Sequence, residues 1–140
     1  MRKLNVCITV AGLAVTALTT TGCLLFVAGA GAGVGAIAYH DNELISSRDV
    51  SMDRAWDAAN AAMTEMEYTI VPAETHKDAT GGVVQGYNAK NQVVRIKLAR
   101  QTETTTELRI RVGAFATSDD RRAEQLLYEK IVKHFPPIRH

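Results

Sequence analysis

The sequence predicts an α+β fold, in which an antiparallel sheet of about four to five strands carries two amphipathic helices packed on one of its faces. Two stretches, near residues 52–66 and 119–135, repeat apolar residues every three or four positions, as amphipathic helices do. Between them, short segments alternate apolar and polar residues, which is typical of half-buried antiparallel strands. A helix-free run between two helices favours α+β over a parallel α/β sheet.

Length and composition limit the classes of protein that fit. The 140 residues allow one ordinary domain. Lys and Arg number 16 against 15 Asp and Glu, and this near-neutral balance argues against a nucleic-acid partner. Both cysteines, Cys7 and Cys23, lie near the N-terminus, which excludes a disulfide scaffold or a thiolate zinc site in the rest of the chain.

The N-terminal part has the composition of an export signal. Arg2 and Lys3 precede the apolar run Leu4–Leu18, and small residues follow up to Cys23. No charged residue or histidine occurs from Leu4 to Tyr39, whereas charged residues are frequent from His40 onward. We therefore expect a signal peptide over 1–22, an apolar tether over 23–40 and a globular α+β domain over 41–140.

The end of the signal resembles the lipobox of bacterial lipoprotein precursors. Thr21-Gly22-Cys23 matches its last three positions, whereas Thr20 stands where those precursors usually have Leu. The resemblance implies cleavage before Cys23 and lipid attachment to it, and acyl chains anchor stably when two or more are present. Leu24, in place of Asp after that Cys, implies the outer membrane if the host has two. The alternative is an unmodified Cys23 in a transmembrane helix.

The tether contains a glycine and alanine repeat, AGAGAGVGA over residues 28–36. Its glycines form two pairs spaced four apart, Gly29 with Gly33 and Gly31 with Gly35. This spacing would let two helices approach closely, so the four glycines are candidates for helix self-association. The alternative is a flexible tether or an interfacial helix, because each Gly costs a helix ~1 kcal/mol relative to Ala.

The elements of the domain follow from the pattern in order. We expect a strand over 43–50 and a helix from Ser51, whose core stripe is the set Met52, Trp56, Ala59, Met63 and Met66. Strands are expected over 68–71, 83–87, 92–100 and 107–112, with turns at 89–91 and 104–105. The last helix is expected to start near Asp119-Asp120 and to bury Ala123, Leu126, Leu127, Ile131 and Phe135.

One surface feature is a candidate binding site. Alternation places Arg95, Lys97, Arg109 and Arg111 on the wet face of the sheet, with Glu107 among them. Two interpretations stay open. The residues form either a solvated face with cross-strand charge pairs, or a docking face for an anionic partner such as a lipid headgroup or a phosphorylated glycan.

No residues suggest catalysis, a metal or a cofactor. The histidines lack ligand spacing, and the serines lack a GxSxG turn. We therefore expect a non-enzymatic envelope protein, anchored to a membrane by lipid, with a structural or interaction role and an envelope protein as partner. The alternative is a periplasmic module that binds an anionic ligand on the basic sheet face.

The whole chain also resembles the small proteobacterial lipoproteins grouped as domain of unknown function 3568. The shared features are Cys23 with its Gly/Ala run, then SMDRAWDAANAAM, GGVVQGYNAKNQVVRIKL and ELRIRVGAF, and a closing amphipathic helix. The resemblance implies an envelope location. It implies no known activity and supplies no catalytic residues.

Overall fold

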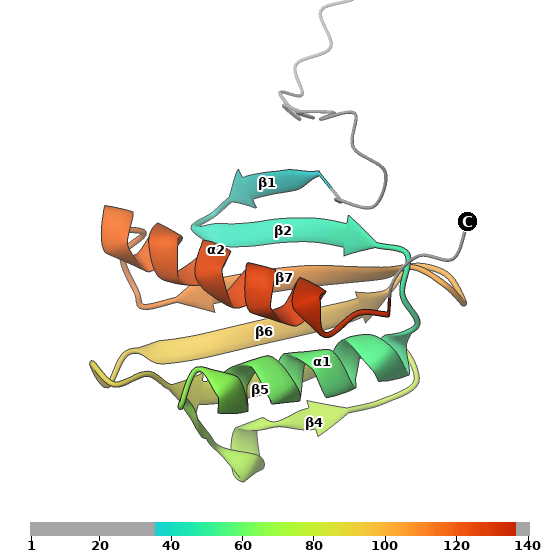
Figure 1. Ribbon diagram of the computed structural model, residues 1–140, viewed down its shortest axis with the longest axis horizontal. Coiled ribbons are helices and arrows are strands. Elements are labelled where there is room, and N and C mark those ends of the chain that lie inside the picture. The colour runs from blue at the N-terminus through green and yellow to red at the C-terminus, as the bar shows by residue number, and fades with distance from the viewer. Residues whose placement is uncertain (1–35, 137–140) are drawn as a thin grey trace, which may run out of the picture.

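The computed structural model describes residues 36–136, in which one sheet carries both α-helices on the same face (Figure 1). Within these residues the sheet has seven strands, its strand pairs are antiparallel, and the predicted α+β class is confirmed. The elements are β1 Ile37–His40, β2 Glu43–Arg48, α1 Met52–Glu65, β3 Thr69–Ile70, the 3-10 turn η1 Pro72–Glu74, β4 His76–Lys77, β5 Gly81–Tyr87, β6 Val93–Arg100, β7 Thr106–Val112 and α2 Ser118–Lys133.

The strand order places β6 and β7 in the middle of the sheet. The order is β1-β2-β7-β6-β5-β3, and the short β4 also pairs with β5. Ile96 of β6 lies opposite Ile110 of β7, and both are fully buried beneath the helices. In β6 and β7 the residues that alternate with the buried ones point to the opposite face of the sheet, which is the face without helices.

The sheet begins before the expected domain boundary at residue 41. Ile37–His40, which the sequence analysis assigned to the tether, forms β1 and pairs with β2. Asp41 and Asn42 have φ values of 47° and 64°, as a two-residue hairpin turn of type I′ requires. The uncharged composition of the tether runs on into this strand, so composition alone gave no boundary there.

Small residues bring α1 close to the sheet. Its buried residues are Met52, Ala55, Ala58, Ala59, Ala62 and Met63. The expected stripe is therefore partly wrong, because Trp56 and Met66 are only partly buried and pack at the margin of the core. Trp56 lies over Gly82, where an added Cβ would be 2.8 Å from the indole ring. Ser51 occupies the N-cap position, but its side chain makes no capping hydrogen bond.

Helix α2 is capped by a reciprocal pair of hydrogen bonds. The Thr117 hydroxyl accepts from the backbone N–H of Asp120, and the Asp120 carboxylate accepts from the backbone N–H of Thr117. The buried face of the helix consists of Asp120, Glu124, Leu127, Tyr128 and Ile131.

The expected core position of Leu126 is wrong. Its side chain is 46% exposed, while the neighbouring Leu127 is fully buried. The core stripe passes through two carboxylic acids, Asp120 and Glu124, and a hydrophobicity pattern does not count acids as core. Their hydrogen bonds make their burial tolerable.

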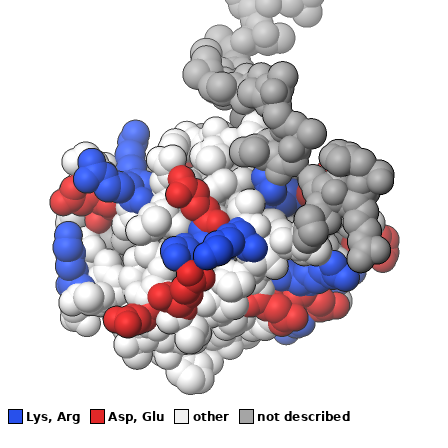
Figure 2. All heavy atoms as spheres, viewed as in Figure 1, with Lys and Arg blue, Asp and Glu red and all other residues white. Residues whose placement is uncertain are grey.

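The helix-covered face carries acidic and basic side chains close together rather than a patch of one sign (Figure 2). One group on this side joins the two helices: Lys130 and His134 of the α2 end contact Glu65 of α1 at 2.6 and 3.0 Å. In the part of the chain that the structure describes, neither helix is long and apolar enough to cross a membrane.

Candidate functional site

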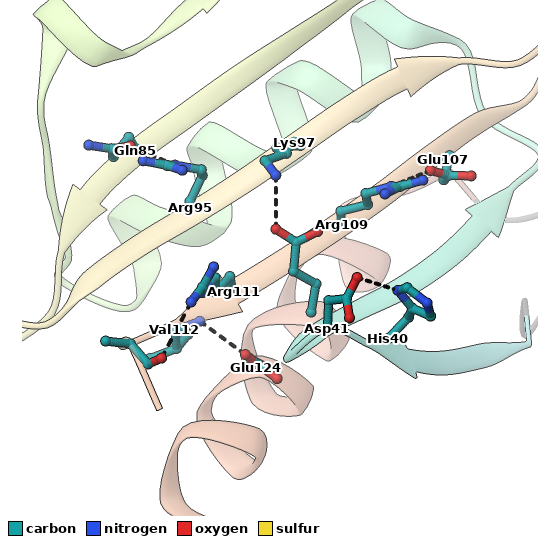
Figure 3. Close-up of polar contacts among 12 residues, drawn as sticks. His40, Asp41, Gln85, Arg95, Lys97, Glu107, Arg109, Arg111, Val112 and Glu124 are labelled. Atoms are coloured by element: carbon teal, nitrogen blue, oxygen red, sulfur yellow. Dashed lines mark hydrogen bonds and ion pairs between the residues drawn. The ribbon is translucent and has the colours of Figure 1, made fainter. Parts of the chain in front are cut away.

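The four basic residues singled out in the sequence lie together on the sheet face opposite the helices (Figure 3). Arg95 and Lys97 belong to β6, and Arg109 and Arg111 belong to β7. The register pairs Lys97 with Arg109 and Arg95 with Arg111. The face therefore contains two rows of opposed cations.

One of these rows is neutralised by carboxylates. Lys97 Nζ lies 2.9 Å from Glu43 Oε1, and Arg109 Nε donates to Glu107 Oε1 at 2.6 Å. That hydrogen bond and the charge of Glu107 raise the pKa of Arg109. This half of the face matches the interpretation as a solvated surface of paired charges.

The other row has no such compensation. Arg95 Nε donates to the amide oxygen of Gln85 at 2.8 Å, and Arg111 Nη2 donates to the Ala114 carbonyl at 3.3 Å. Within residues 36–136, neither guanidinium forms an ion pair with a carboxylate. Each arginine uses one of its five N–H donors in these bonds, so donors remain for a ligand.

The uncompensated pair lines a pocket of about 520 Å³. The rest of the wall comes from the Asn91–Val93 segment that leads into β6 and from the Gly113–Phe115 loop that follows β7. Phe115 is 80% exposed, more than any other large apolar side chain in residues 36–136, and Val93 is 38% exposed. The pocket thus combines two guanidiniums with an apolar rim.

The backbone holds the loop beside the pocket in a defined way. Gly113 has a φ of +72°, and its N–H donates to the Val93 carbonyl at 2.9 Å. The turn at Gly113 directs the chain away from β7, and the contact between Arg111 and Ala114 fixes the next residue. Arg111 therefore faces the pocket and also contacts the loop that carries Phe115.

The nearest buried acids are held by hydrogen bonds of their own. Glu124 accepts from the backbone N–H of Val112 at 3.0 Å, and its pKa is raised, chiefly by burial. Burial also raises the pKa of Asp120, but hydrogen bonds from Thr117 and Gln92 outweigh it, so the net pKa is lowered. The charge of Arg111 has a smaller, opposing effect and lowers the pKa of Glu124.

Sequence reasoning missed several residues of this site. Glu43 reaches Lys97 across an intervening strand, and Phe115 lies in a loop, so neither follows from alternation within one strand. The Gln85–Arg95 contact could be found only from the register between β5 and β6.

Cys23 and the four glycines Gly29, Gly31, Gly33 and Gly35 lie outside the described residues. Among residues 36–136, no group of three or more His, Cys, Asp or Glu could hold a metal.

Comparison with protein families gives a match over nearly the whole chain. The family model described as "Protein of unknown function (DUF3568)" matches residues 5–134. The chain belongs to this family. The match confirms the family that the sequence resembles, and in this DUF3568 protein it includes the N-terminal segment with Cys23, every strand that the structure describes and all of α2. No curated protein matches the chain.

Proposed function

We propose that this DUF3568 protein is a lipoprotein of the cell envelope, anchored by Cys23, whose domain binds an anionic group between Arg95 and Arg111 without catalysing a reaction. The uncompensated arginine pair carries the proposal. Its two neighbours on the same strands, Lys97 and Arg109, each have a carboxylate, whereas the pair that lines the pocket has none within the described residues.

The physical chemistry of the pair supports an oxyanion as ligand. Like charges directly opposite each other destabilise an antiparallel sheet, and a bound anion would remove that repulsion. Guanidinium groups present planar donors that match phosphate and carboxylate oxygens in bidentate geometry. Arg95 is oriented by Gln85 and Arg111 by Ala114, so both donors are positioned before a ligand arrives.

The anchor is supported by the sequence alone. A positive start, an apolar run and Gly22 before Cys23 agree with a lipoprotein signal. Mass spectrometry of the membrane-extracted protein should show a mature chain that starts at Cys23 with added acyl mass. A Cys23→Ser variant that is processed and held at the membrane like the wild type would overturn this part.

The binding site is tested by titrating the full chain, in non-ionic detergent, with inorganic phosphate and following the amide shifts of the Gly113–Phe115 loop. We expect saturable binding that weakens about tenfold in Arg95→Gln, because one charge-assisted hydrogen bond is worth ~1.5–3 kcal/mol. The matched control is Arg109→Gln, which removes the same charge from the paired row. Equal weakening in both variants would indicate a diffuse charge effect and contradict a site.

A further inference from the structure

Resting on the proposed function, we propose that the ligand is an amphiphile: a phosphate ester whose head lies between Arg95 and Arg111 and whose apolar chain lies against Phe115. Its source is a phospholipid of the membrane to which the chain is anchored. The pocket joins the two chemistries within one wall, because both guanidiniums and the exposed aromatic ring line it.

The size of the pocket supports a ligand larger than a free phosphate. Its volume of about 520 Å³ falls within the ~300–1,000 Å³ that is usual for small-molecule sites. The two arginines occupy one part of the wall, and Val93, Ala114 and Phe115 supply apolar surface beside them. An inorganic ion would leave that apolar surface in water.

The exposed apolar side chains at the edge of the pocket are suited to contact an apolar part of a ligand. Phe115 is 80% exposed and Val93 is 38% exposed, so neither contributes its full surface to the core of the described domain. Burying such surface against an acyl chain is favourable, and each methylene covered adds to affinity. Arg111 connects the two halves of the site, because it faces the pocket and bonds the carbonyl of Ala114, next to Phe115.

The charge balance argues for one headgroup rather than a charged membrane surface. Without Arg2 and Lys3, the chain keeps 14 of its 16 basic residues against 15 acidic ones. A domain with this balance is not drawn to anionic lipid as a whole. The attraction is local to the arginine pair. The residues between Cys23 and Ile37 keep the domain within about 50 Å of the anchor, at no more than ~3.6 Å per residue.

The test compares soluble phosphate esters that differ only in chain length. The full chain is held in dodecyl maltoside micelles, which contain no phosphate, and is titrated with methyl phosphate and with hexyl phosphate, with the loop amides as the readout. We expect hexyl phosphate to bind about tenfold more tightly than methyl phosphate. Phe115→Ser should remove this gain, so that the two esters bind this variant with equal affinity. Leu126→Ser, which alters another exposed apolar residue on α2, should keep the gain.

The outcomes separate this inference from the proposed function. Equal affinity for the two esters would overturn the amphiphile and leave the anion site standing, whereas no binding of either ester would overturn both. The source is tested in the same micelles with ten per cent phosphatidylglycerol added, where we expect competition to weaken hexyl phosphate binding several-fold. Undiminished binding there would overturn the membrane phospholipid and favour a soluble amphiphile.

Discussion

Arg95 and Arg111 lie directly opposite each other on adjacent strands, and in the described part of the chain neither has a carboxylate partner. One row further along the same two strands, Lys97 and Arg109 face each other with Glu43 and Glu107 beside them. The two rows lie on the same pair of strands and differ in whether carboxylates pair with their cations. The uncompensated row is the one that borders the pocket.

This difference predicts a trade between stability and binding. Arg111→Gln should raise the free energy of unfolding by a few tenths of a kcal/mol, up to about 1, because it removes a like-charge pair and only a 3.3 Å contact with Ala114. The same variant should bind phosphate more weakly. Arg109→Gln should not gain stability, since it breaks a 2.6 Å contact with Glu107. Urea unfolding measures the stability of both variants. A loss of stability in Arg111→Gln would contradict the repulsion between Arg95 and Arg111.

Because α2 buries Leu127 and exposes Leu126, substitutions at these adjacent leucines should differ sharply in their effect on stability. Leu127→Ala should cost about 2–5 kcal/mol, because it leaves a cavity in the core. Leu126→Ala should change stability by less than about 0.5 kcal/mol, as surface substitutions do. Chemical denaturation of the two variants checks this. Comparable losses would mean that the helix buries the face originally expected from the sequence.

Gly86 is a position where any side chain should be harmful. A Cβ there would clash with the backbone carbonyl oxygen of Thr69 on β3 and would lie 2.8 Å from Cε of Met63. The methionine can move, but the backbone of a paired strand cannot do so cheaply. Gly86→Ala should therefore lower stability by about 1–3 kcal/mol. A thermal midpoint equal to that of the wild type would show that β3 does not pack as described.

Glu124 should make stability depend on pH in a predictable direction. Burial raises its pKa above the ordinary 4.5, so the folded state holds the proton more tightly than the unfolded state. The stability it contributes is present below that ordinary value and is lost as the pH rises through the raised pKa.

A Glu124→Gln variant mimics the protonated acid and keeps an oxygen that can accept from Val112. Its stability relative to the wild type should therefore increase as the pH rises from about 4 to 8. Denaturant unfolding across that range measures the difference. A difference that stays constant with pH would show that the carboxyl titrates as it does in the unfolded chain.

Alternation within single strands was enough to place the basic residues on one face. The pattern of β6 and β7 put Arg95, Lys97, Arg109 and Arg111 on the wet side, because side chains in a strand alternate with a period of two. The same pattern could not separate the paired row from the unpaired one. That distinction depends on Glu43, which lies two strands from Lys97 in the sheet.

The errors on the helices have a common physical origin. Hydrophobic patterning favoured Trp56 and Leu126 as core residues, whereas the structure buries small alanines on α1 and carboxylic acids on α2. Alanine contributes little to a hydrophobicity pattern. In α1 its small side chain lets the helix pack close to the sheet. Glu124 can be buried only because the N–H of Val112 is available to it, a contact that depends on tertiary structure.

Native mass spectrometry of the full chain, extracted in mild detergent from the cells that express it, tests the central claim most directly. Wild type and Arg109→Gln should each carry one phosphate-containing anionic lipid. The Arg95→Gln/Arg111→Gln double variant, equally folded by circular dichroism, should lack it. The same adducts on all three proteins, or a wild type that carries none, would contradict a lipid site at Arg95 and Arg111.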